Sequence, residues 1–288
     1  MKKRMLLTTF LILLLSGCSL QKIALRSTTG LLFYGIDAIY QEPDLQLAGQ
    51  AIASDLKLLE GLYLADPKNT DLLMLLTQGY ASYSLGFVED EDPARGRLFY
   101  LRARDYGFQL LQQSTEAFRD SVPEREAQFV ERLANLKEED VPALFWTAFA
   151  WGGWINLSKD NTQAVFDLNK VKAMMQRVIE LDEDYFFGAA HLFFGSLAGS
   201  LPRMLGGDPE AARQHFQRAL NLTDGKFMLA NVYLARYYAA TTLDEDLFDQ
   251  YLQQVLAAPV DILPGYQLIT AIAKDKALRL LASKDDLF

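Results

Sequence analysis

Hydrophobic residues recur every three to four positions along most of the chain, and polar residues occupy the positions between them. This spacing gathers the apolar side chains on one face of an α-helix. The strict apolar-polar alternation that is typical of a half-buried β-strand does not occur in the sequence. The pattern therefore predicts an all-α fold. We expect helices over residues 24–41, 44–65, 70–87, 94–120, 123–136, 141–158, 164–181, 185–200, 208–222, 226–241, 244–258 and 265–284.

One stretch, 206–222 (GGDPEAARQHFQRALNL), shows how such helices could pair. Its two glycines predict a turn, and Asp208 predicts an N-cap ahead of a proline at the first helical position. Ala212, Phe216 and Ala219 follow at the spacing of the second helix of a tetratricopeptide (TPR) repeat. Small residues at these positions would let two helix backbones approach closely.

Partial matches to the same repeat occur in residues 66–80, 171–178 and 230–237, although most signature residues are substituted. Stacked repeats of this kind bury one continuous core. We therefore expect a single domain over residues 30–288, built as a TPR-like superhelix of helical hairpins with cryptic, degenerate repeats.

Two of the expected helices, 141–158 and 185–201, carry no Asp, Glu, Lys or Arg. One interpretation is a pair of membrane spans, in which Gly195 and Gly199 would form a G-x-x-x-G association motif. Both runs are barely long enough for a span, and each contains polar residues. We favour the other interpretation, two helices buried in the protein core, in which the two glycines are close-packing positions.

The N-terminus has the pattern of a lipoprotein signal peptide. Residues 2–4 are basic and residues 5–15 are apolar, which is the length of a signal-peptide core. The segment 15–18 (LSGC) resembles a bacterial lipobox, and Cys18 is the one cysteine of the chain. We expect residues 1–17 to be removed and Cys18 to be acylated with palmitate. The alternative is an ordinary signal peptide with a coincidental cysteine.

Residues 18–29 would then form a lipidated tether, since several acyl chains make a stable membrane anchor. Ser19 follows the cysteine. By resemblance to enterobacterial lipoproteins, a residue other than Asp there implies the outer membrane, with the protein facing the periplasm. The formal net charge of −9 disfavours nucleic acid as a partner, because phosphate backbones are bound by Lys and Arg.

No catalytic, metal or cofactor motif is assembled in the sequence, so we expect neither an enzyme nor a cofactor. The two histidines lie outside any metal-ligand spacing. We expect His191 in the core or against a ligand, and His215 at the surface. The acidic run 89–92 (EDED) lacks the glycine and the distal Glu of a calcium loop, so we expect a solvated loop rather than a Ca²⁺ site.

The helix expected over 141–158 carries the first candidate ligand residues. At 3.6 residues per turn, Trp146, Trp151 and Trp154 fall within one arc of about 140°. They form either a core stripe or a ligand wall, because an indole offers a flat apolar face and one N–H donor. Asn156 projects from the opposite side of the same helix and is a further candidate.

The other candidates combine aromatic rings with cations. Tyr233, Arg236 and Tyr237 share one expected helix, and Arg236 could pair with a ligand carboxylate, which its guanidinium fork matches. The alternative is a salt bridge between repeats. Arg203, beside the Gly-Gly turn, allows the same two interpretations.

Several blocks of the sequence resemble the TatT family, the tetratricopeptide lipoproteins associated with TRAP transporters. These blocks are YLRARDYG (100–107), FWTAFAWGGW (145–154), LPRMLGGDP (201–209), AARQHF (211–216), VYLARYYA (232–239) and LLASKDDLF (280–288). The resemblance covers most of residues 30–288, and the block around the Gly-Gly turn is its most specific part.

The resemblance implies an all-α fold with cryptic TPR motifs, a ligand cleft or pore, and a homo-oligomer, a trimer. It also implies partnership with a TRAP-type periplasmic solute-binding protein and a small organic acid or hydrophobic ligand. We therefore expect a non-enzymatic, membrane-anchored lipoprotein that assists TRAP-type solute uptake. The alternative is a TPR scaffold lipoprotein that binds peptides in envelope or pilus assembly.

Overall fold

The computed structural model describes residues 29–200, 203–205 and 207–288, and the predicted all-α class is confirmed. Within these ranges the chain forms helices and contains no β-strand. The helices are residues 29–40, α2 (Leu45–Ala65), α3 (Thr70–Phe87), α4 (Pro93–Ser114), α5 (Glu126–Leu133), α6 (Val141–Asn156), α7 (Thr162–Leu181), α8 (Tyr185–Gly199), α9 (Pro209–Leu222), α10 (Met228–Leu234), α11 (Ala240–Thr242), α12 (Glu245–Ala257) and α13 (Gln267–Ala282). Single turns are η1 (Glu138–Asp140), η2 (Arg203–Leu205), the π-helical η3 (Ala235–Ala239) and η4 (Lys284–Asp286).

Short polar side chains begin most of the long helices. An Asp or Asn side chain accepts a hydrogen bond from the first turn at Asp44, Asn69, Asp92, Asn161, Asp208 and Asp244. At α9 the predicted cap is confirmed, because the Asp208 Oδ1 accepts from the Ala211 N–H at 3.0 Å and Pro209 is the first helical residue. Such caps satisfy backbone donors that have no partner within the helix.

Two expected helices were too long. The prediction of 94–120 was wrong at its end, because α4 stops at Ser114 and Thr115 is extended (φ −117°, ψ 143°). The Thr115 hydroxyl donates to the Leu111 carbonyl at 2.8 Å and accepts from the Phe118 N–H at 3.3 Å. Such a side chain competes with the helix for backbone partners. The helix expected over 123–136 is reduced to the eight residues of α5.

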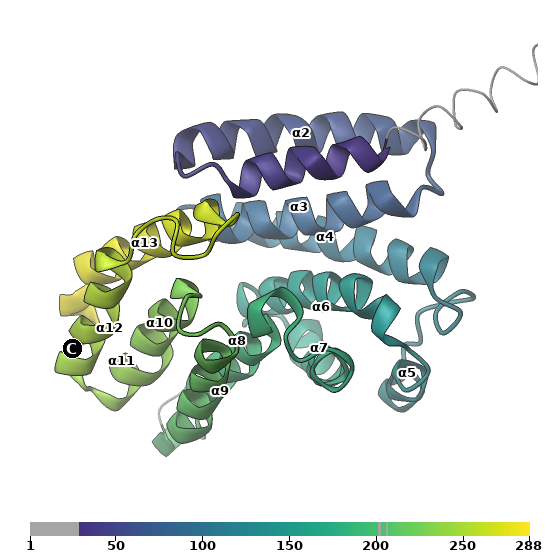
Figure 1. Ribbon diagram of the computed structural model, residues 1–288. Coiled ribbons are helices and arrows are strands. Elements are labelled where there is room, and N and C mark those ends of the chain that lie inside the picture. The colour runs from purple at the N-terminus through teal and green to yellow at the C-terminus, as the bar shows by residue number, and fades with distance from the viewer. Residues whose placement is uncertain (1–28, 201–202, 206) are drawn as a thin grey trace, which may run out of the picture.

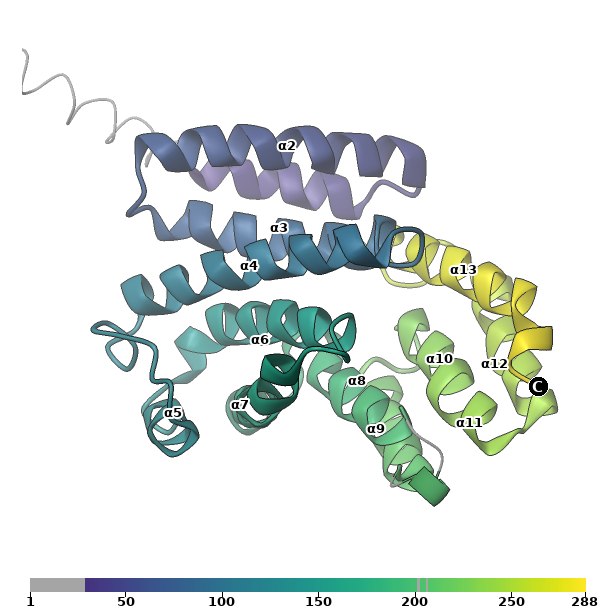
Figure 2. The same cartoon turned by 180° about the vertical axis from the view of Figure 1, so that it is seen from behind.

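Most helices that follow one another in the chain pack against each other, and the chain curves back on itself. Contacts join α2 to α3, α3 to α4, α6 to α7 and α8 to α9. Figure 1 shows α2, α3 and α4 side by side along one edge, with α6 beneath α4 and α13 near the end of α3. The view from behind shows the same order (Figure 2). The TPR-like repeat within this arrangement stays a prediction.

Small residues lie where α8 meets its neighbours, as predicted. A methyl group added to Gly195 would lie 2.5 Å from the Phe216 ring in α9, and one added to Gly199 would lie 2.1 Å from the Tyr237 carbonyl oxygen. Phe216 itself is fully buried together with Ala212 and Ala219. Among the described residues, no helix combines the length and the apolar character that a membrane span requires.

Candidate functional site

The start of α8 contains a left-handed turn that the sequence pattern did not predict. Phe186 (φ 45°, ψ 53°), Phe187 (φ 65°, ψ 28°) and Gly188 (φ 67°, ψ 28°) all have positive φ. This conformation costs roughly 1–2 kcal/mol for each residue that has a Cβ. Two successive phenylalanines therefore stay in it only because the surrounding packing fixes them.

That packing comes from aromatic rings on three other parts of the chain. The Phe186 ring centroid lies 4.8 Å from that of Trp146 in α6 and 6.4 Å from that of Tyr40. The Phe187 centroid lies 4.9 Å from that of Tyr266, the residue before α13. The Tyr40 and Tyr266 centroids are 5.0 Å apart. We define the aromatic belt as Tyr40, Trp146, Phe149, Tyr185, Phe186, Phe187 and Tyr266.

Most rings of the aromatic belt remain partly exposed. Trp146 is 2% exposed, whereas the other six rings are intermediate between buried and exposed. The Tyr40 hydroxyl accepts from the Gln78 amide at 2.6 Å, and burial raises the pKa of Tyr40 well above its usual range. Burial also raises the pKa of Tyr185 to about 12. Both phenols therefore stay neutral at physiological pH, so the belt offers apolar faces and uncharged hydroxyls.

A buried ionic cluster adjoins the belt. Lys276 in α13 is 6% exposed, and its Nζ lies 3.1 Å from Glu89 Oε1 and 2.5 Å from Asp90 Oδ2. Burial alone would lower the pKa of Lys276, but the charges of Glu89 and Asp90 raise it. The solvated loop predicted at 89–92 is found at Asp90, Glu91 and Asp92, which are exposed. The prediction was wrong for Glu89, because its largely buried side chain pairs with a lysine from the other end of the chain.

Tyr100 connects the ionic cluster to the belt. Its hydroxyl donates to Glu89 Oε2 at 2.6 Å, and its ring centroid lies 6.3 Å from that of Phe149. Burial, followed by the charge of Glu89, raises the pKa of Tyr100 well above its usual range. The described residues thus form a continuous path from the left-handed turn, through α6, to buried charges.

Two of the predicted ligand residues, Arg236 and Tyr237, lie in the π-helical turn η3, and a third, Tyr233, lies just before it in α10. The Arg236 guanidinium carbon is 5.4 Å from the Tyr237 ring centroid, and the Tyr237 and Tyr233 centroids are 5.8 Å apart. Arg236 is exposed, and no carboxylate of the described residues lies within ion-pair distance of it. The salt bridge between repeats, which was the alternative interpretation of Arg236, is therefore not formed within the described residues. Single π-helical turns occur frequently at functional sites.

The three tryptophans do not form one wall. Trp151 faces the other side of α6, where its ring centroid is 5.0 Å from that of Phe108. Its buried Nε1 has no hydrogen-bond partner among the described residues. Trp154 lies under Arg104, whose guanidinium carbon is 5.3 Å from the Trp154 ring centroid. Asn156 is exposed at the end of α6. Ligand contact by these residues stays a prediction.

His191 belongs to a separate polar cluster between α8 and α9. Its Nδ1 lies 3.0 Å from His215 Nδ1, and its Nε2 lies 3.0 Å from Glu183 Oε1. Arg218 donates to both oxygens of Glu183, at 2.9 and 2.5 Å. The surface position expected for His215 was wrong, because the ring is half-buried against His191. Arg203 is exposed in η2.

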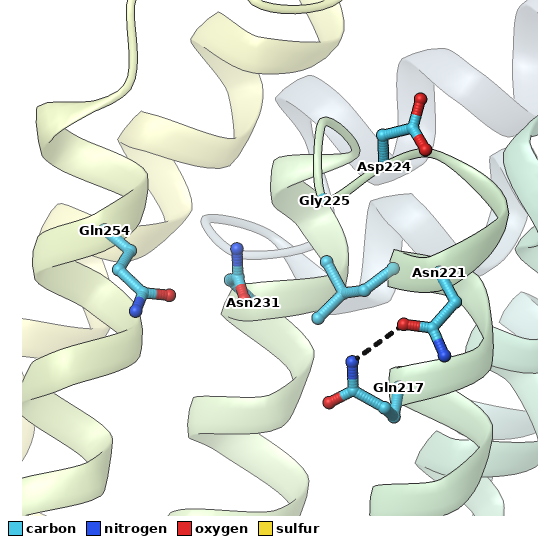
Figure 3. A pocket seen from close by; sticks show the side chains of 7 residues that line it. Gln217, Asn221, Asp224, Gly225, Asn231 and Gln254 are labelled. Carbon is cyan, nitrogen blue, oxygen red and sulfur yellow. Dashed lines mark hydrogen bonds between the residues drawn. The ribbon is translucent and has the colours of Figure 1, made fainter.

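A groove lies between α9, α10 and α12 (Figure 3). Four carboxamide side chains line it: Gln217, Asn221, Asn231 and Gln254. The remaining lining residues are Leu220, Asp224 and Gly225, and the cavity volume is about 360 Å³. Sequence reasoning missed this groove, because its amides come from three helices and form no motif.

The fold and these sites define an all-α protein with an aromatic interior, and the residues that the structure describes assemble no acid-base set. The family model of the TRAP transporter T-component (TAtT) matches residues 41–288. This protein therefore belongs to the TRAP transporter T-component family, and the predicted resemblance is confirmed. A protein of Treponema pallidum (strain Nichols), described as an uncharacterized protein, is 24% identical over 305 aligned positions, which cover 96% of this chain and 94% of the relative.

Proposed function

We propose that this protein assists TRAP-type solute uptake by binding the transported solute, the periplasmic solute-binding protein, or both. Family membership supports a role associated with TRAP transport. The aromatic belt supports solute binding, because two phenylalanines are held in a costly left-handed turn among partly exposed rings. This strained turn is the observation that carries the proposal.

The chemistry of the site suggests the class of solute. Ligand sites are lined mainly by apolar and aromatic groups, with a few polar groups that fix orientation. The rings of the belt supply an apolar, aromatic surface, and the hydroxyls of Tyr40 and Tyr185 supply polar groups. Arg236 has no ion-pair partner among the described residues, so its guanidinium is available to donate hydrogen bonds to a ligand carboxylate. We therefore propose a hydrophobic solute or a small organic acid.

The role we propose is non-enzymatic. The histidine cluster is the nearest approach to catalytic chemistry in the described residues, yet Glu183 is engaged by Arg218 and His191 by Glu183 and His215. Each member therefore already has a partner that stabilises it. An accessory role in transport requires no bond-breaking step.

We also propose that Cys18 carries the lipid anchor, in the outer membrane and facing the periplasm. Cys18 and the rest of the lipobox lie outside the described residues, so the lipobox sequence alone supports this part. Labelling cells with a palmitate analogue should mark the wild type and leave Cys18→Ser unlabelled. A labelled Cys18→Ser variant would contradict the anchor. The homotrimer implied by the resemblance remains a proposal, which light scattering of the purified chain tests.

The proposed partnership is tested by titrating the full chain with the TRAP solute-binding protein of the same organism in a calorimeter. The titration is run with the carrier both empty and loaded with solute. We expect saturable heat in at least one state of the carrier. Absence of binding in both states would remove the partner role. A complex formed only with peptides would instead support the scaffold alternative.

A further inference from the structure

We propose that the amide groove between α9, α10 and α12 binds an extended polypeptide segment of a partner protein through its main chain. The four carboxamides of the groove carry the same functional group as a peptide bond. Each provides one carbonyl acceptor and two N–H donors. A row of such groups can pair with the alternating donors and acceptors of an extended chain without reading its side chains.

Asn231 places a buried side-chain amide with one weak contact at the groove. The residue is 5% exposed, lines the groove from the second turn of α10, and faces Gln254 across it (Figure 3). Within the described part of the chain, its amide nitrogen has one recorded contact, the Met228 sulfur at 3.9 Å. A buried amide with so weak a partner loses its hydrogen bonds to water and gains little in return. A ligand in the groove would supply the missing partner.

The helices position the other carboxamides, and some of their donors and acceptors have no hydrogen-bond partner. The Gln217 Nε2 donates to the Asn221 Oδ1 at 3.1 Å, which leaves the Gln217 carbonyl oxygen facing the groove (Figure 3). Gln254 is exposed, and its side-chain amide has no hydrogen bond within the described residues. The groove therefore presents unpaired donors and acceptors from three helices.

The lining offers no counter-charge to an anionic solute. Asp224 is the one charged residue among the described residues that line the groove; its side chain is 86% exposed and its Oδ2 lies 3.5 Å from Lys226 Nζ. No Lys or Arg of these residues lines the groove, so a carboxylate would find no counter-charge there. A carbohydrate is less well matched, because the lining holds no aromatic ring for a sugar face. Neutral peptide groups fit this surface best.

The groove shares no residue with the aromatic belt, so the inference stands apart from the proposed function. A negative result for solute binding at the belt would leave the proposal of peptide binding intact, and the reverse also holds.

The test is a titration of the ¹⁵N-labelled full chain, in which the side-chain NH₂ signals of Asn and Gln are observed directly. The probe is a capped, uncharged heptapeptide of alternating serine and valine. A second probe carries N-methyl groups on alternate residues, which removes main-chain donors and keeps the side chains. Maltose and succinate are the competing ligands.

We expect the unmethylated peptide to shift the Asn231 and Gln254 signals in a saturable way. Gln254→Ala should weaken binding about fivefold, the loss expected for one hydrogen bond. Gln253→Ala is the matched control, because Gln253 is the preceding residue of α12, is also exposed, and does not line the groove. It should bind as the wild type does.

Three results would overturn the proposal. Equal binding of the N-methylated peptide would show that the main chain is not read. Shifts by maltose or succinate alone would assign the groove to a small solute. Equal weakening by Gln253→Ala and Gln254→Ala would place the peptide outside the groove.

Discussion

The Lys276 Nζ in α13 lies 3.1 Å from the Glu89 Oε1, although 187 positions separate the two residues in the chain. Both side chains are largely buried, at 7% and 15% exposure. The C-terminal helix is thereby attached to the connection between α3 and α4, at the edge where Figure 1 shows α13 beside α3. This contact fixes α13 relative to α3 and α4.

Loss of Lys276 should be strongly destabilising. Lys276→Met leaves Glu89 and Asp90 without their shared counter-charge, and removing one partner of a buried pair typically costs about 3–5 kcal/mol of the free energy of unfolding. Urea unfolding measures the loss. Lys226→Met is the control, because that side chain is 48% exposed and its pair with Asp224 should contribute about 1 kcal/mol or less. Equal losses for the two variants would contradict the account.

The contact between α8 and α9 should lose stability at acid pH, because Glu183 becomes protonated there. The hydrogen bonds from Arg218 lower the pKa of Glu183 from 4.5 to about 2, against an opposing effect of burial. The folded state therefore gains stability from this carboxylate above pH 4.5 and loses it as the pH falls towards 2.

Melting temperatures of wild type and Glu183→Gln, recorded from pH 6 to pH 2, test this point. The wild type should melt at the higher temperature above pH 4.5, and the difference should vanish near pH 2. Glu116→Gln, whose parent side chain is 89% exposed, should follow the wild type throughout. A difference between wild type and Glu183→Gln that stays constant with pH would rule out the carboxylate as its cause.

Two glycines of helices should respond oppositely to alanine. In Gly199→Ala the new methyl group would lie 2.1 Å from the Tyr237 carbonyl oxygen, a backbone atom, and such overpacking costs about 1–3 kcal/mol. In Gly61→Ala the methyl group meets no atom within 4 Å, and the helix gains about 1 kcal/mol from the higher propensity of alanine. Calorimetric melting should give opposite shifts. Shifts of the same sign would contradict the packing of α8 described above.

Local sequence signals predicted the helices well where a cap defined their start. The helices α2, α3, α9 and α12 begin within one residue of the expected positions, because Asp44, Asn69, Asp208 and Asp244 cap them. The length of α4 was overestimated because a threonine can end a helix through its own hydrogen bonds, which hydrophobic spacing does not report.

The site was predicted less completely, because its key features depend on distant partners. The apolar run that contains Phe186 and Phe187 follows helical spacing, but this spacing carries no information on the sign of φ. The largely buried position of Glu89 was not predicted, because its buried partner, Lys276, lies near the other end of the chain. Trp146 was a candidate on sequence grounds and its contact with a ligand stays a prediction, whereas its belt partners Tyr40, Phe186 and Tyr266 come from three other parts of the chain.

The most direct test of the central claim is native mass spectrometry of the full chain after incubation with a periplasmic small-molecule extract. We predict a non-covalent adduct of one small organic molecule. The adduct should be lost in Tyr266→Ala, which removes a ring of the aromatic belt, and retained in Tyr251→Ala, which removes a half-buried tyrosine of α12 outside it. A bare mass for the wild type, or an adduct that survives Tyr266→Ala unchanged, would contradict solute binding at the belt.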